Sequence, residues 1–119
     1  MVIAHKTEAE LSTLSDRQLR SRRAALARQL PDVAAAIRGS LSAQRRRCGR
    51  EGCRCASGQL HGPYVYLSVR RRGRSRLLYV PAEVAEEVGL RIRLTAEIEA
   101  TLAEISAVNL ELLGRGRLG

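Results

Sequence analysis

The sequence predicts a mostly α-helical fold with one small β-hairpin, and three observations support this prediction. Apolar residues recur at helical spacing on both sides of a central segment. Phe and Trp are absent, and the 45% of hydrophobic residues are mainly aliphatic, which suits helix–helix packing. Residues 64–80 alternate large and branched side chains on either side of a turn, as a hairpin does. We therefore expect long helices, packed antiparallel, to flank a Cys-rich loop and a basic two-stranded hairpin.

Residues 1–41 are expected to form an N-terminal helical arm. After a short helical lead-in over residues 1–13, Ser15 and Gln18 match a capping box, which marks the start of a helix. Pro31 is expected either to kink this helix or to end it before a second helix begins. Aliphatic side chains at three-, four- and seven-residue steps form one predicted apolar stripe on this arm, namely Leu19, Leu26, Leu30, Val33, Ile37 and Leu41.

Residues 42–80 form a Cys- and Arg-rich central segment. Its first part, residues 42–63, lacks periodicity and is rich in Gly, Cys, Arg and Ser, so it is predicted to be a loop. The two hairpin strands are predicted over residues 64–70 and 75–80, joined by a turn in which Gly73 can adopt positive φ. Because an isolated hairpin is only marginally stable in water, helices or a bound metal ion must hold it.

Residues 81–113 are predicted to form a C-terminal amphipathic helix that starts at Pro81, and residues 114–119 a loose tail. Gly89 offers a point at which this helix breaks in two. At 119 residues the whole chain, 1–119, is expected to be a single domain. The apolar stripe of the C-terminal helix consists of Val84, Val88, Ile98, Leu102, Ile105 and Leu112.

The net charge of +9 is concentrated in the middle of the chain. Residues 41–80 contain ten Arg and one acidic residue, Glu51, whereas residues 81–119 contain seven Glu and four Arg. A dense basic cluster attracts polyanions, and guanidinium groups bind phosphate bidentately. A two-stranded ribbon also fits the DNA major groove, so we expect nucleic acid as the partner, DNA ahead of RNA. The predicted contact residues are Arg45, Arg46, Arg47, Arg50, Arg54, Arg70, Arg71, Arg72, Arg74 and Arg76.

A candidate metal site lies in the same segment, where Cys48, Cys53, Cys55 and His61 occur within fourteen residues. Three thiolates and one imidazole are an established ligand set for structural zinc, so a zinc ion is the predicted cofactor. The spacing differs from the common Cys-x2-Cys knuckle, and three alternatives stay open. The cysteines could ligate an iron–sulfur cluster, take part in redox chemistry, or bind no metal at all. The imidazole of His61 could also hydrogen-bond the turn before Pro63 instead of binding metal.

The three tyrosines of the chain lie on the predicted hairpin. Tyr64 and Tyr66 occupy alternate positions, so they share one face of their strand, and Tyr79 lies on the returning strand. Exposed tyrosines could stack on nucleic-acid bases. We expect instead that they pack on the helices, and that the arginines of the hairpin contact phosphate.

Other function classes find little support in the sequence. No apolar run approaches the ~20 residues of a membrane span, and no secretory signal is recognised, so the protein is expected in the cytoplasm. No paired carboxylates and no phosphate-binding glycine loop point to an enzyme, and neither does a nucleophile–base pair beyond Cys with His61. The alternative function is a helical homodimer or adaptor that binds an acidic protein partner. Heptad-like spacing at Ile98, Ile105 and Leu112 supports a dimer through the C-terminal helix, although a bundle core has the same spacing.

The central motif resembles that of a known protein family. The chain reads Cys48-Gly-x3-Cys53-x-Cys55, followed by His61-Gly-Pro-Tyr64 and then by the hairpin and a helix. This pattern is similar to that of small, basic prokaryotic proteins that share a domain of unknown function. The resemblance spans about residues 45–113 and implies no activity, so the proposed ligands rest on their spacing.

Overall fold

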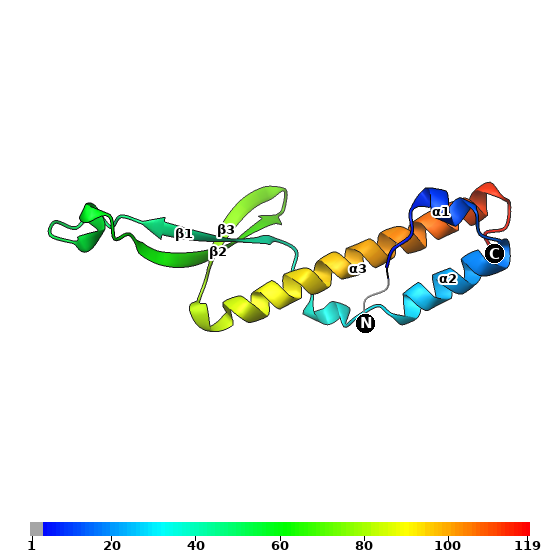
Figure 1. The fold of residues 1–119 in the computed structure, drawn as a ribbon, viewed down its shortest axis with the longest axis horizontal. Helices are drawn as coiled ribbons and strands as arrows, with labels where there is room; N and C mark the ends of the chain where they lie inside the picture. The colour runs from blue at the N-terminus through cyan, green and yellow to red at the C-terminus, as the bar shows by residue number, and fades with distance from the viewer. Residues whose placement is uncertain (1–3) are drawn as a thin grey trace. The chain divides into compact units, whose positions relative to one another are not determined.

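The structure is a computed structural model that describes residues 4–119 (Figure 1). The described chain has an α+β fold, with three antiparallel strands and a long C-terminal helix, so the predicted mostly α fold with a two-stranded hairpin is wrong. In chain order the elements are α1 (Glu8–Ser12), α2 (Asp16–Arg28), the 3-10 helix η1 (Val33–Ala35), β1 (Ser40–Arg46), the 3-10 helix η2 (Arg54–Ser57), β2 (His61–Arg71), β3 (Arg74–Val80) and α3 (Ala82–Gly114).

The strand that the sequence did not predict is β1. It lies in the segment that was assigned partly to the helical arm and partly to a loop, and it contains no β-branched residue. Its stability comes from pairing with β2, in a register that sets Leu41 opposite Leu67 and Gln44 opposite Tyr64. Because such strands depend on distant partners more than on their own propensity, local periodicity could not reveal this one.

The helix α2 is shorter than the helical arm that the sequence predicts. As expected, α2 begins with a capping box, in which Ser15 Oγ accepts from the Gln18 N–H and the Gln18 side chain accepts from the Ser15 N–H. The helix ends at Arg28, before Pro31, which has no N–H to donate and clashes with a preceding helical turn. The predicted apolar stripe therefore does not continue along one helix beyond Leu26, and Leu41, its last predicted member, lies in β1.

The contacts divide the chain into two compact units. The first contains the described residues up to Ala36 together with Leu94–Gly119, and the second contains Ile37–Arg93. In the first unit, α2 runs antiparallel to the C-terminal part of α3 (Figure 1), since Arg22 pairs with Glu104 and Asp16 pairs with Arg115. The core of this unit consists of Leu11, Leu19, Val108 and Leu112, all almost fully buried.

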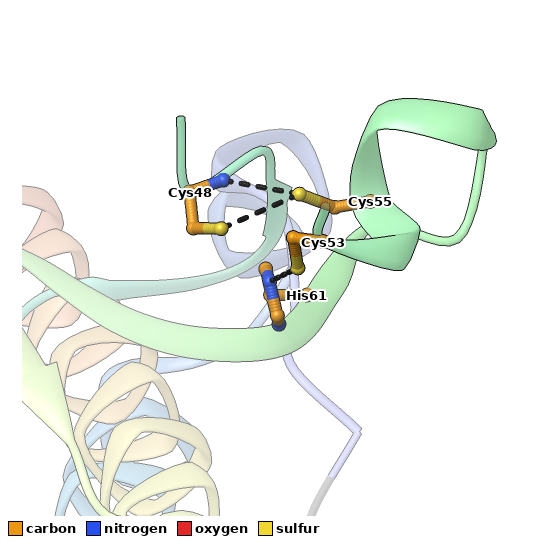
Figure 2. A group of neighbouring side chains, drawn as sticks. All are labelled: Cys48, Cys53, Cys55 and His61. Carbon is orange, nitrogen blue, oxygen red and sulfur yellow. Dashed lines mark hydrogen bonds between the residues drawn. The ribbon is translucent and has the colours of Figure 1, made fainter. Parts of the chain in front are cut away.

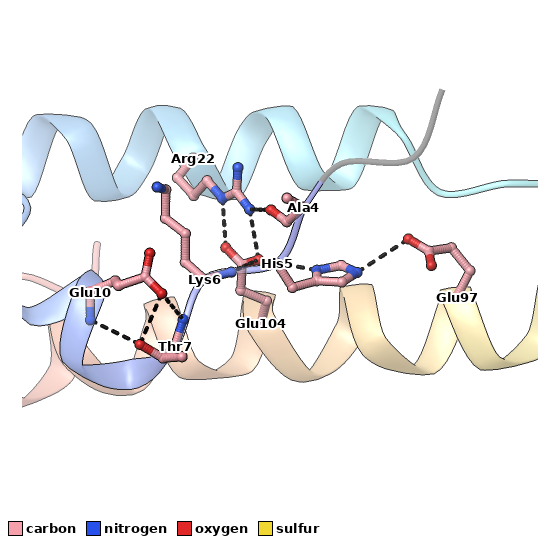
Figure 3. Close-up of polar contacts among 8 residues, drawn as sticks. All are labelled: Ala4, His5, Lys6, Thr7, Glu10, Arg22, Glu97 and Glu104. Carbon is pink, nitrogen blue, oxygen red and sulfur yellow. Dashed lines mark hydrogen bonds and ion pairs between the residues drawn. The ribbon is translucent and has the colours of Figure 1, made fainter.

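A buried carboxylate joins three segments of the first unit (Figure 3). Arg22 donates to Glu104 through Nε at 2.6 Å and Nη2 at 2.7 Å, and the backbone N–H of Lys6 donates at 2.9 Å. His5 lies between two carboxylates, with Nδ1 3.1 Å from Glu104 and Nε2 3.2 Å from Glu97. Burial raises the pKa of Glu104, but the hydrogen bonds from Arg22, Lys6 and His5 outweigh burial and hold it at about 2.

The second unit is built on the sheet, whose strand order is β1-β2-β3. Alternation places Val65 and Leu67 on one face of β2 with Val80 across from Val65, and Leu67 and Val80 are the buried members. The backbone of α3 approaches this apolar face at Gly89, where a Cβ would lie 3.6 Å from the Leu41 side chain. The helix continues through Gly89 without a break.

The hairpin turn between β2 and β3 agrees with the prediction. Arg71 and Arg74 are paired, so the loop contains only Arg72 and Gly73, with φ of 53° and 76°. Two-residue hairpin loops prefer positive φ at both positions because this twist matches that of the strands, and glycine adopts it without strain. No helix in the described part of the chain combines the length and apolarity required to cross a bilayer.

We expect acid to weaken the first unit through Glu104. Its pKa is held at about 2, below the ordinary value of 4.5, so its ion pairing stabilises the fold fully above pH 4.5. This contribution is lost as the pH falls from about 4.5 towards 2, where the folded carboxylate takes up a proton. Chemical denaturation across this range should show Glu104→Gln less stable than wild type at pH 7 and nearly equal at pH 2. A constant difference between the two proteins at all pH values would contradict this role.

Candidate metal centre and basic sheet surface

The four predicted ligands converge at one end of the sheet (Figure 2). His61 is the first residue of β2 and pairs with Arg46 at the end of β1, so the sheet brings His61 close to Cys48, two residues further on. Cys53 precedes η2 and Cys55 lies within it, so one helical turn directs both thiols back to the sheet. We call these four side chains the Cys3His cluster.

Glycine makes the close approach of the loop to the sheet possible. Gly62 follows His61 with φ of +110°, a conformation that L side chains rarely adopt. A Cβ at this position would lie 2.8 Å from the Gln44 carbonyl oxygen, closer than van der Waals contact allows. Any other residue at position 62 would therefore push apart the strands that hold His61 beside Cys48.

The distances between the ligand atoms fit a metal ion. All four donor atoms lie within 4.8 Å of one another. Cys48 Sγ is 3.5 Å from Cys55 Sγ, and Cys53 Sγ is 3.1 Å from His61 Nε2. A tetrahedral ion with bonds of about 2.0–2.3 Å holds its ligands about 3.5–3.8 Å apart, so small shifts would form such a site. The residues present can hold a metal ion.

Hydrogen bonds set the pKa values of two of the thiols. The backbone N–H of Cys48 donates to Cys55 Sγ at 3.3 Å and lowers the pKa of the buried Cys55 thiol to about 7. The backbone N–H of Arg50 donates to Cys48 Sγ, but the neighbouring thiols outweigh this bond and raise the pKa of Cys48. A cation between the sulfurs would favour the deprotonated thiolates, which are the form that binds metal.

The predicted arginines gather at two ends of β2. Along its last five residues, the hairpin carries a hollow of about 790 Å³ lined by Arg71, Arg72, Arg74, Arg76 and Leu78, which we call the hairpin hollow. At the N-terminal end, a second hollow of about 380 Å³ lies against the Cys3His cluster, and we call it the cluster hollow. It is lined by Arg46, Arg47, Arg50 and Tyr64, together with Cys48, Cys53 and His61.

The remaining predicted arginines lie outside these hollows. Arg45 and Arg54 are exposed and line neither. Arg70 is exposed and donates to the Gly73 carbonyl oxygen at 3.1 Å, so it braces the hairpin turn. The structure thus concentrates the predicted basic surface into two places on one sheet.

The tyrosines differ from the expectation that they pack on helices. The register sets Tyr66 opposite Tyr79, and their rings meet edge to face with centroids 5.9 Å apart. The guanidinium of Arg46 lies 4.9 Å from the centre of the Tyr66 ring, in a cation–π contact. Tyr79 is 58% exposed, so this face of β2 and β3, which we call the tyrosine face, presents an aromatic ring to solvent. The two-residue turn sets the register that places Tyr79 opposite Tyr66. This register was the signal in the sequence that could have located the tyrosine face.

The fold and its site define an α+β protein with a Cys3His cluster at the end of a basic three-stranded sheet. The chain belongs to the family described as domain of unknown function (DUF6788), which matches residues 16–89. This range contains α2, the whole Cys3His cluster and the sheet, so it begins earlier and ends sooner than the resemblance over 45–113 suggested. Searches of curated proteins and of solved structures each found no significant match.

We expect protein purified without chelator to contain about one metal ion per chain, because the four donor atoms already converge. Elemental mass spectrometry should detect this metal, and a thiol count should show that the cysteines do not react while the metal is bound. Cys53→Ser should lose most of the metal, whereas Glu51→Gln, an exposed change in the same loop, should retain it. Metal-free protein with three freely reactive thiols would contradict the site.

Proposed function

We propose that this chain is a non-enzymatic nucleic-acid-binding protein, in which a structural zinc ion holds the Cys3His cluster and the arginine-rich hairpin contacts phosphate. DNA is the expected partner ahead of RNA, because the end of the β2–β3 hairpin beyond Ser68 has no β1 partner, and a two-stranded ribbon of this kind fits the DNA major groove. The observation that carries this proposal is the hairpin hollow, where four arginines surround one concave surface.

The charges of the hairpin support phosphate as the ligand. Arg71 and Arg74 are directly opposite each other across the turn, and like charges in this position destabilise a strand pair. The lining of the hollow includes no acidic residue among those that the structure describes. A phosphate between these guanidinium groups would relieve their repulsion and accept bidentate hydrogen bonds.

Zinc is the metal that the donor set favours. Thiolate sulfur and imidazole nitrogen are the ligands of tetrahedral structural zinc, and four protein ligands leave no open position for catalysis. The N–H groups of Cys48 and Arg50 donate to sulfur atoms of the cluster, as outer hydrogen bonds commonly do around thiolate ligands. In this proposal the zinc ion folds residues 47–61 and so positions the arginines on either side of Cys48.

A second candidate function, a helical dimer or adaptor for an acidic protein partner, rests on exposed leucines of α3. Leu102, Leu110 and Leu113 are each more than half exposed on the first unit. Large apolar side chains of this kind are common at interfaces when they form a patch. A dimer that persists after loss of the cysteines, with no affinity for polynucleotide, would favour this function over the first.

We expect binding to duplex DNA to weaken steeply with salt, because arginines that neutralise phosphates release bound counterions. Replacing Arg71, Arg72 and Arg74 with Gln should lower affinity at least about tenfold at low salt. It should also reduce the slope of log affinity against log salt by about 2 to 3, which is about 1 for each lost phosphate contact. Fluorescence anisotropy over a salt series measures both quantities.

The matched control replaces Arg17, Arg28 and Arg93 with Gln, since all three are exposed arginines on helices. This triple variant loses the same formal charge and should bind DNA nearly as tightly as wild type. Equal losses in the two variants would show that net charge alone, and not the hairpin, determines binding. Unchanged affinity in the hairpin variant would contradict the proposed surface.

A further inference from the structure

The cluster hollow differs from the hairpin hollow in shape and in surroundings. It is smaller, about 380 Å³, and it is lined both by members of the Cys3His cluster and by the first residues of β2. Arg47 immediately precedes Cys48 and Arg50 follows it by two residues, so both belong to the backbone that the metal ion would order. A volume of this size is within the usual range of small-ligand pockets.

The charge balance of this hollow points to a dianion. Arg46, Arg47 and Arg50 bring three positive charges. A divalent ion with three thiolates and one neutral imidazole carries one negative charge, so the surroundings have a net charge of two positive. A phosphate monoester carries about −1.5 to −2 near pH 7, whereas each internal phosphodiester of a nucleic acid carries only −1. The hollow therefore complements a terminal phosphate better than an internal one.

Aromatic side chains continue from the hollow along the sheet. Tyr64 lines the hollow itself, Tyr66 lies two residues further along the same face, and Tyr79 lies opposite Tyr66. Residues two apart on a strand are about 6.6 Å from each other, which allows successive unpaired bases to stack on neighbouring aromatic rings. Sheet faces with exposed aromatics are a common surface for single-stranded nucleic acid.

We propose that the cluster hollow binds the terminal phosphate of a single-stranded nucleic acid, and that the adjoining bases stack on the tyrosine face. This inference rests on the proposed nucleic-acid-binding function and names the part of the nucleic acid that the site recognises. Arg47 and Arg50 hold the phosphate, while Arg46, in contact with the Tyr66 ring, lies between the phosphate and the first stacked base. The hairpin hollow is a separate contact, because Arg71, Arg74 and Arg76 lie on the face of Leu67, opposite the tyrosine face.

The test compares single strands of about eight nucleotides, a typical length for a binding site of this kind, with a phosphate or a hydroxyl at the end. One strand carries a 5′-phosphate, one a 3′-phosphate and one neither, and a fourth, unphosphorylated strand is lengthened to match the charge of the phosphorylated ones. Metal-loaded protein should bind one of the phosphorylated strands at least about tenfold more tightly than the charge-matched strand. The end that gives the preference identifies the polarity of the bound strand.

Two variants locate the preference. Arg47→Gln with Arg50→Gln should abolish the preference for a terminal phosphate, and binding of the unphosphorylated strand should change little. The hairpin variant with Gln at positions 71, 72 and 74 should weaken all strands by a similar factor and retain the preference. Equal binding of phosphorylated and charge-matched strands by wild type would overturn this inference alone. Failure to bind both single strands and duplex DNA would overturn the proposed function as well as this inference.

Discussion

The convergence of three thiols and one imidazole at the end of the sheet is the constraint on which the proposed binding surface depends. Sulfur atoms 3.5 Å apart repel one another once deprotonated, and hydrogen bonds with the Cys53 and Cys55 side chains raise the pKa of Cys48. A cation that binds all four donors converts this unfavourable arrangement into a fixed one. The loop over residues 47–61 has few buried apolar side chains of its own, with Cys55 the buried one, so the cluster is the main source of its order.

The strand β2 connects this cluster to the rest of the proposed binding surface. It begins at His61 and ends at Arg71, so the same strand supplies a ligand, two tyrosines and the first arginine of the hairpin turn. Its eleven residues span about 33 Å at about 3.3 Å each, with the cluster hollow beside its first residues and the hairpin hollow beside its last five, on the other face of the sheet. Two basic surfaces held on one strand favour, in the proposed function, a polyanion over a small anion as the ligand.

Local signals in the sequence were sufficient to locate the four clustered side chains and the turn between β2 and β3. The cysteines and His61 lie within fourteen residues, and Gly73 marks a turn whose geometry is decided by the two residues in it. Strand β1 was missed because its pairing with β2 is a long-range contact that its own weak propensity does not reveal. The exposure of Tyr79 depends on which face of the sheet α3 leaves uncovered, and the hollows depend on how the loop returns to the sheet. These features arise only when distant segments meet.

The most direct test of the account is X-ray absorption spectroscopy at the edge of the metal bound to the purified full-length chain. The account predicts a four-coordinate zinc with three sulfur atoms at about 2.3 Å and one nitrogen at about 2.0–2.1 Å. His61→Ala should remove the nitrogen and leave the three sulfur atoms. A coordination shell of oxygen atoms, or one in which fewer than three sulfurs appear, would contradict the proposed centre and with it the ordered loop that carries the basic surface.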